Sequence, residues 1–227
     1  MRDSSLNTPS ARDPRVDALA QSSALLAESR AAQVVSPELR ALADALGALP
    51  LDALPPTDEG RVAFWVNVYN ALMRHAVLAF DLRAGARVPL GVFQRASYLI
   101  GGQRFSLHVI EHGVLRCNRP APFTLWRPLR PRDPRTSAAP SRFDPRVHFA
   151  LNCAAASCPP VRDYRAETLD ASLDLATRSY VQAETSLDDA FQVLSGGASA
   201  VVVVAAGRPS GVLTKLDLLE HLAHRVG

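Results

Sequence analysis

The sequence predicts an α+β fold in which helices pack on a small mixed sheet, followed by a C-terminal β-α-β-β-α unit. Stretches rich in Leu and Ala at helical spacing occupy the first third, and short strand-like runs follow in the middle. The last part alternates strand-like and helix-like segments. We therefore expect a flexible tail over residues 1–15, a main domain over residues 16–180 and a small unit over residues 181–227.

The composition is typical of a globular protein and gives no reason to expect a nucleic-acid or membrane partner. Hydrophobic residues make up 48% of the 227 residues, enough for a full core, and the net charge is only +3. The N-terminal segment is polar, and no apolar stretch is long enough for a membrane span, so neither a signal peptide nor a transmembrane helix is expected. We expect a soluble, cytoplasmic protein with reduced thiols.

Three helices are expected in the first part of the main domain. Residues 16–48 carry Leu and Ala at helical spacing, and a break near Ser36 and Pro37 favours two helices. Residues 61–80 are apolar on nearly every side, which predicts a buried helix.

The few polar residues of that buried helix form one stripe. Asn67, Asn70 and Arg74 follow the spacing i, i+3, i+7, and His75 lies beside them. Buried amides either donate to a developing oxyanion or bind the backbone of a neighbouring loop. The sequence leaves both roles open for Asn67 and Asn70.

The middle of the chain predicts a strand and a short helix before a long loop. Residues 96–116 predict a strand, a Gly-Gly turn and a helix that begins near Ser106 and contains Glu111 and His112. Residues 117–146 are rich in Pro and Arg without periodicity, which predicts a surface loop.

After the loop, a strand and a helix are expected. The segment RVHFALNC, residues 146–153, alternates in a way that places His148 and Asn152 on one face of a strand. Residues 166–181 predict an amphipathic helix. The small C-terminal unit predicts, in order, a capped helix, a buried strand, a turn, a second strand and a closing helix, over residues 185–194, 198–206, 207–211, 212–214 and 215–225.

The stretch LNCAAASCPP contains two of the three cysteines, Cys153 and Cys158, and suggests a thiol nucleophile. A catalytic cysteine needs an imidazole base in reach and a group that orients this base. His112 or His148 could be the base, Glu111 could orient it, and Asn67 and Asn70 could donate to the oxyanion. The candidate catalytic residues are therefore Cys153, His112, Glu111, Asn67, Asn70 and Cys158.

The expected geometry ranks these candidates. On an extended strand His148 would lie about 16 Å from Cys153, which favours His112 as the base. Cys158 precedes two prolines, which lack N–H donors, so Cys153 is favoured as the nucleophile. A hydrolase or acyl transferase of papain or transglutaminase type uses such parts, and a fold of that type fits the α+β prediction.

Three other roles for the two thiols remain open. They could bind a metal with a histidine, although the spacing is wider than in most structural zinc sites and no second ligand pair exists. They could form a disulfide, for which no oxidising compartment is indicated. They could also be small buried hydrophobic side chains.

Residues 60–180 resemble the domain of unknown function 547 (DUF547) family of bacteria and plants. The resemblance rests on AFWVNVYNAL at 63–72, SLHVIEHGVLR at 106–116 and DPRVHFALNCAAASCPPVRDY at 144–164. It implies a predominantly bacterial setting and these site residues, but no settled reaction. The family usually continues further after the helix at 166–181, so we expect a shortened domain.

Residues 180–226 resemble a single cystathionine β-synthase (CBS) motif. The segment GVLTKLD is similar to that family's nucleotide-contacting signature, which implies that Thr214 and Asp217 meet phosphate and ribose. The resemblance implies regulatory AMP, ATP or S-adenosylmethionine, with no cofactor required for a reaction. Because such motifs work in pairs, it also implies a homodimer through this unit.

Two functions of different classes follow from the sequence. The first is a cysteine-dependent hydrolase or acyl transferase with a small-molecule or peptide substrate and a nucleotide-sensing or dimerising tail. The second is a non-enzymatic binding or scaffold protein that dimerises through the same tail. A third interpretation is a chain that joins two shortened pieces.

Overall fold

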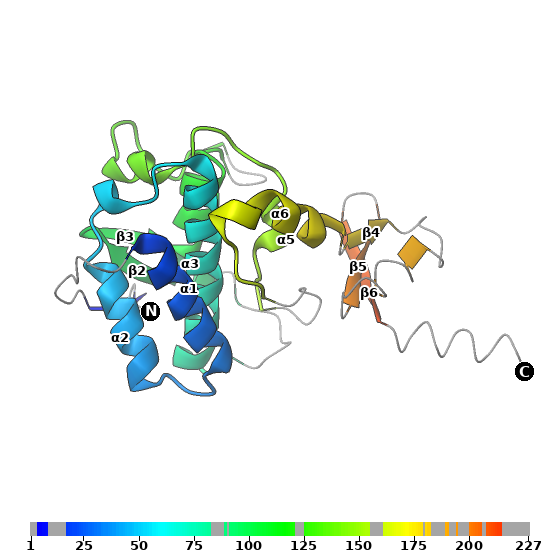
Figure 1. The fold of residues 1–227 in the computed structure, drawn as a ribbon, viewed down its shortest axis with the longest axis horizontal. Helices are drawn as coiled ribbons and strands as arrows, with labels where there is room; N and C mark the ends of the chain where they lie inside the picture. The colour runs from blue at the N-terminus through cyan, green and yellow to red at the C-terminus, as the bar shows by residue number, and fades with distance from the viewer. Residues whose placement is uncertain are drawn as a thin grey trace, which may run out of the picture.

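The computed structural model shows an α+β fold built around one long helix, in agreement with the predicted class (Figure 1). The structure describes residues 4–8, 17–82, 89, 91–120, 125–154, 161–178, 180–182, 189–190, 194, 200–205 and 208–214.

The long helix is α3 (Asp58–Ala79), and most of its residues are buried. Thr57 caps its first turn by accepting a hydrogen bond from the Gly60 N–H at 3.1 Å. The helix α1 (Ala18–Ala31) packs along α3, and α2 (Pro37–Gly47) packs on α1. The prediction of a buried third helix is confirmed.

The break between α1 and α2 occurs where the sequence predicts it. Ser36 is the N-cap of α2, because its hydroxyl accepts from the Leu39 N–H at 3.0 Å, and Pro37 occupies the first turn. Proline is tolerated there because the first N–H groups of a helix have no partner within it. The same chemistry begins α1, where Asp17 accepts from the Ala20 N–H at 3.0 Å.

A small sheet forms beside these helices. After the short helix α4 (Gly91–Arg95), β2 (Ala96–Ile100) pairs with β3 (Gln103–Ser106) in an antiparallel hairpin. The two turn glycines between them have φ values of +57° and +69°, a conformation that glycine adopts without strain. The Gly-Gly turn is confirmed, but β3 was not expected as a separate strand because it has only four residues.

Within the segment 1–15, where a flexible tail is expected, the described residues 4–8 dock on the fold. β1 (Ser4–Ser5) runs parallel to β2, which makes the sheet mixed, as predicted. Asn7 is buried, and its amide donates to the carbonyl of Ala43 at 2.9 Å and accepts from the Leu99 N–H at 2.7 Å. This docking depends on the single amide of Asn7, which joins α2 to the sheet. The polar composition of the segment therefore did not predict it.

The predicted loop over residues 117–146 is irregular in its described part, apart from the 3-10 helix η3 (Pro134–Ala138). This helix closes over the core. The indole N–H of the fully buried Trp65 donates to the Ala138 carbonyl at 3.0 Å. The loop is therefore part of the packed structure.

The predicted strand over residues 146–153 is wrong, because Val147–Ala150 form a helical turn, α5. The reason lies in the preceding Asp-Pro pair. Asp144 accepts from the Arg146 N–H at 2.9 Å, and its carbonyl accepts from the Val147 N–H at 3.2 Å. These local hydrogen bonds start a helical turn, although the alternating sequence pattern predicts a strand.

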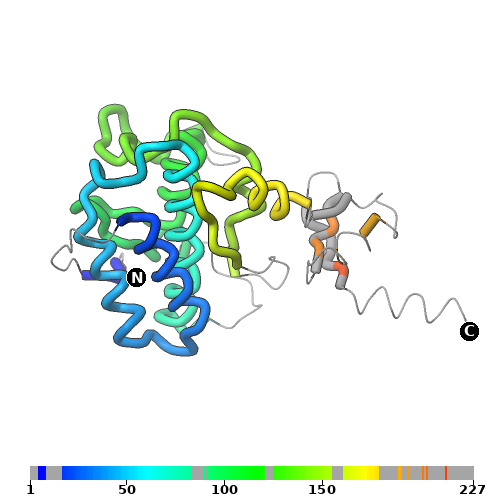
Figure 2. The backbone as a smooth tube through the Cα atoms, in the orientation of Figure 1, coloured from blue at the N-terminus to red at the C-terminus, as the bar shows by residue number. Residues whose placement is uncertain are grey.

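The predicted helix over residues 166–181 is present as η4 (Ala166–Thr168) and α6 (Leu169–Arg178). The chain then enters a second sheet of order β4-β5-β6, with β4 (Tyr180–Gln182), β5 (Ala200–Ala205) and β6 (Arg208–Thr214), which Figure 1 labels. Figure 2 shows the backbone in the same orientation as a tube. This sheet has its own small hydrophobic cluster of Ala190, Leu194 and Val201. The expected turn over residues 207–211 is mostly strand, because β6 begins at Arg208.

Candidate functional site

The candidate site begins with a π-helix, η2 (Val109–Leu115), which carries Glu111 and His112. The Arg116 N–H donates to the Glu111 carbonyl at 2.9 Å, and Asn118 donates to Gly113 at 3.1 Å, the i to i−5 pattern of this helix. The short helix after Ser106 is thus confirmed, with a wider turn than expected. Such helices are rare and recur at functional sites.

Glu111 is the centre of the site. Its Oε1 lies 3.9 Å from Nε2 of His112 and 3.6 Å from Nδ1 of His148, which comes from α5. Burial alone would raise the pKa of Glu111, but its contact with His148 and the nearby His112 and Arg116 lower it below the usual range. The carboxylate is therefore ionised at neutral pH.

His112 is a buried, neutral histidine with both ring nitrogens occupied. Arg116 Nη1 lies 2.8 Å from Nδ1 of His112. A guanidinium can only donate, so Nδ1 accepts and the ring proton sits on Nε2, which faces Glu111. Burial lowers the pKa of His112 to about 4, against the opposing effect of Glu111. His112 is therefore better suited to holding Glu111 in position than to accepting a proton as a general base.

His148 differs from His112 in that it is partly exposed to solvent. Its side chain is 40% exposed, its ring packs edge-on against Phe143, and its Nδ1 faces Glu111. A carboxylate at Nδ1 favours the tautomer in which Nε2 is the basic nitrogen. Of the two candidate bases, His148 therefore has the orientation that a general base needs.

Cys153 follows α5 in a segment that Asn70 fixes. The Asn70 amide donates to the Ala150 carbonyl at 3.0 Å and accepts from the Asn152 N–H at 2.8 Å. Cys153 is half-buried, and the next residue, Ala154, has a φ of +61°, which is uncommon for a residue with a side chain. The backbone path around Cys153 is thus set by a buried side chain and a strained residue.

Asn67 makes the equivalent contact further along the chain. Its amide donates to the Tyr164 carbonyl at 2.9 Å and accepts from the Tyr164 N–H at 3.0 Å. Both amides of the polar stripe on α3 therefore bind loop backbone, one of the two roles that the sequence left open. No oxyanion role is visible in these contacts, and that role stays a prediction.

The other predicted site residues are placed only in part. Cys158 and Asp217 lie outside the described residues, and Thr214 is the last residue of β6. The disulfide alternative involves Cys158 and therefore stays a prediction, as it falls on a residue that the structure does not describe. No group of three or more metal-binding side chains occurs within the described ranges.

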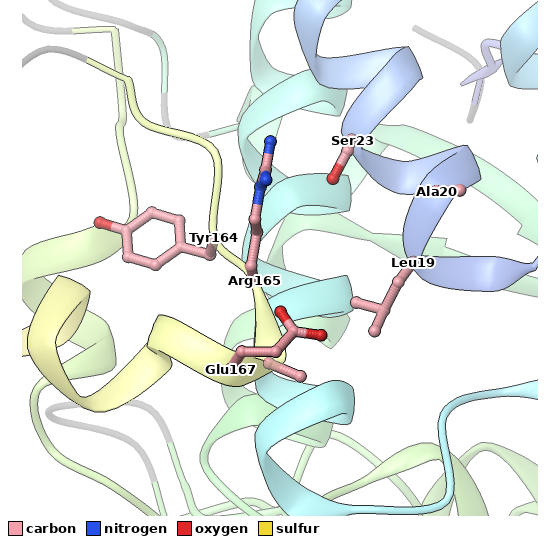
Figure 3. Close-up of a pocket in the computed structure, with 7 residues that line it drawn as sticks. Leu19, Ala20, Ser23, Tyr164, Arg165 and Glu167 are labelled. Carbon is pink, nitrogen blue, oxygen red and sulfur yellow. The ribbon is translucent and has the colours of Figure 1, made fainter.

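A pocket of about 310 Å³, which the sequence did not predict, lies between α1 and residues 164–167 (Figure 3). Figure 3 shows Glu167 and Leu19 facing each other across it. Two residues that line the pocket bind Asp163, which accepts from the Ser23 hydroxyl at 2.7 Å and from Arg165 Nε at 3.1 Å. Sequence patterns could not reveal it, because Asn67 is what brings its two distant segments together.

Comparison with known proteins identifies the family. Among the helices that the structure describes, none has both the length and the apolar character needed to cross a bilayer. No curated protein and no solved structure matches the chain. The family model described as "Protein of unknown function, DUF547" matches residues 55–181, which include α3, η2 and α5. The match ends before β5 and β6, so it lends no support to the CBS resemblance. Because it covers more than half of the sequence, the chain belongs to the DUF547 family.

Proposed function

We propose that the protein is a cysteine-dependent hydrolase or acyl transferase in which Cys153 is the nucleophile and His148 the general base. The observation that carries the proposal is the contact between Glu111 Oε1 and His148 Nδ1 at 3.6 Å. It provides a partly buried carboxylate behind a half-exposed imidazole, the arrangement that activates thiol nucleophiles. Glu111 keeps its predicted orienting role, and His148 replaces His112 as the favoured base.

The helical turn α5 removes the earlier objection to His148. The chain rises about 1.5 Å per residue in a helix, compared with about 3.3 Å in a strand. Because residues 147–150 are helical, His148 is closer to Cys153 along the chain than the strand prediction required. The contacts of Asn70 with Ala150 and Asn152 fix the segment between His148 and Cys153.

The proposed chemistry balances with the groups present. His148 Nε2 takes the thiol proton, and the Cys153 thiolate attacks an acyl carbonyl to give a tetrahedral oxyanion. When the oxyanion collapses, the bond to the leaving group breaks and His148 returns the proton to that group, which leaves a thioester on Cys153. Water or a second nucleophile, deprotonated by His148, then attacks the thioester and regenerates the thiol.

Thiol alkylation tests the proposal without knowledge of the substrate. In a Cys158→Ser background, iodoacetamide labelling would be followed by mass spectrometry at Cys153 and Cys117. Cys117 is an internal control, because burial raises its pKa and its Sγ lies 3.5 Å from the Pro140 carbonyl. We expect Cys153 to react at least about tenfold faster at pH 7, and His148→Ala to remove that advantage. Equal, slow labelling of both thiols would favour the scaffold alternative.

For the C-terminal unit we propose adenine-nucleotide sensing or dimerisation, supported by the CBS resemblance of residues 180–226. A ligand that binds the folded state raises the melting temperature by mass action. AMP, ATP and S-adenosylmethionine would be tested on the wild type and on Asp217→Ala. A rise in melting temperature that the variant loses would support nucleotide sensing. If no ligand raises the melting temperature but the protein has the mass of a dimer, the unit would serve in dimerisation only.

A further inference from the structure

Two large apolar side chains project into solvent from the loop between η2 and η3. The side chains of Leu125 and Trp126 are 89% and 80% exposed. Single exposed apolar residues are ordinary, but an adjacent leucine and tryptophan on a well-packed protein form a surface that a partner would cover.

The loop that carries this pair is anchored. Leu129 is buried, and the Asn118 amide donates to its carbonyl at 3.0 Å and accepts from its N–H at 2.9 Å. Leu129 also packs against Gly113 so closely that a Cβ there would lie 3.1 Å from its Cγ. The exposure of Leu125 and Trp126 therefore occurs close to a fixed point of the loop.

Three cationic side chains follow the apolar pair within six residues of the chain. Arg127, Arg130 and Arg132 are exposed and form no ion pair within the part of the chain that the structure describes. The nearby acid, Asp133, is neutralised by Arg135 through contacts of 2.9 and 2.7 Å. The loop thus combines a local positive surplus with an apolar tip, which the whole-chain charge of +3 conceals.

We infer that residues 125–132 form an interfacial anchor that docks on an anionic lipid surface. Tryptophan favours the boundary between headgroups and acyl chains, because its ring is apolar and its N–H is polar. The three guanidinium groups are complementary to lipid phosphates. Two apolar side chains and three charges predict weak, reversible, salt-sensitive binding. This charge complementarity favours a bilayer over an uncharged apolar protein groove.

The intrinsic fluorescence of the protein provides a direct test. The chain has two tryptophans, and Trp65 is fully buried with its indole N–H bonded to Ala138. A change in the polarity around tryptophan on vesicle addition therefore reports Trp126. Vesicles of phosphatidylcholine alone would be compared with vesicles of equal parts phosphatidylcholine and phosphatidylglycerol, by emission maximum and by co-sedimentation.

We expect a blue shift and co-sedimentation with the anionic vesicles, and several-fold weaker binding to phosphatidylcholine or at high salt. Trp126→Ala should abolish the shift and reduce the sedimented fraction at least about fivefold. The double variant Arg130→Glu, Arg132→Glu should reduce binding while the emission of the free protein stays unchanged. An unchanged melting temperature would show that these exposed substitutions leave the fold intact.

Two outcomes would overturn the inference. The first is an absence of both shift and co-sedimentation with anionic vesicles at low salt. The second is a blue shift that grows with protein concentration in the absence of lipid, which would assign the tip to self-association. Cys153 labelling should be the same in Trp126→Ala as in the wild type, so this test is independent of the proposed catalysis.

Discussion

Oε1 of Glu111 lies 3.6 Å from Nδ1 of His148, and the two residues come from separate elements, η2 and α5. The carboxylate also faces His112, whose other nitrogen accepts from Arg116. One carboxylate therefore joins a buried, neutral histidine to a half-exposed one. In the proposed mechanism, this difference in exposure gives them separate roles: His112 positions the carboxylate, and His148 is the base on the solvent side.

Glu111→Gln should slow Cys153 alkylation at pH 7 by about tenfold, because a neutral amide no longer stabilises the imidazolium that accompanies a thiolate. The pH at which the rate is half-maximal should move upward toward that of an ordinary thiol. The measurement is the labelling rate from pH 5 to 9. Glu59→Gln, at an exposed position of α3, is the control and should leave the profile unchanged. A Glu111→Gln profile identical to the wild type would exclude Glu111 from the proposed mechanism.

Asn70→Ala should lower the free energy of unfolding by about 2–4 kcal/mol, because it leaves the Ala150 carbonyl and the Asn152 N–H without their partner. Asn67→Ala should cost a similar amount through Tyr164. Urea unfolding at pH 7 measures both. Arg40→Ala, an exposed position of α2, should change stability by less than about 0.5 kcal/mol. If the two asparagine variants also changed the free energy of unfolding by less than about 0.5 kcal/mol, their hydrogen bonds to the loop backbone would not stabilise the fold as proposed.

The two turn glycines provide a matched pair. Gly102→Ala meets no neighbour, so only the φ of +69° should cost stability, by about 1 kcal/mol. Gly101→Ala adds a Cβ only 2.9 Å from Leu51 Cγ as well as strain at φ +57°, and it should cost at least about 1 kcal/mol more. Equal urea midpoints for the two variants would show that the contact with Leu51 relaxes freely.

Stability should fall between pH 6.5 and 4 because of buried neutral histidines. Burial lowers the pKa of His75 to about 4, and its Nδ1 lies 2.9 Å from the Tyr98 hydroxyl. Above pH 6.5 neither state binds the proton, whereas below it the unfolded chain does so first, which destabilises the native state. One such histidine contributes a slope of up to about 1.4 kcal/mol per pH unit. His75→Gln should reduce the slope measured from pH 5 to 6 by about that amount, and an unchanged slope would contradict the assignment.

Local signals predicted the helices well, and non-local contacts explain most of what was missed. The caps at Ser36 and Thr57 and the apolar run of α3 act within a few residues, so they are legible in the sequence. The docking of Asn7 and the pocket beside α1 depend on partners distant in the chain. The strand expected at residues 146–153 failed for a local reason, since the Asp-Pro start at Asp144 was given too little weight.

The candidate site shows the same division. The sequence brought Glu111, His112 and Cys153 forward as residue types, but could not show which histidine the carboxylate orients. That choice depends on the exposure of each ring and on Arg116, which occupies Nδ1 of His112. Nor could composition reveal the loop at residues 125–132, because a whole-chain charge averages over a local concentration of arginine.

Four asparagines, Asn7, Asn67, Asn70 and Asn118, share one way of holding the chain. Each amide both donates to a backbone carbonyl and accepts from a backbone N–H of a distant segment. An asparagine of this kind recognises the course of its partner segment and ignores that segment's side chains. Segments held in this way can therefore exchange their side chains over evolutionary time while keeping the same path. The side chains of Ala150, Leu151 and Asn152 can thus vary while Asn70 holds the same backbone path before Cys153.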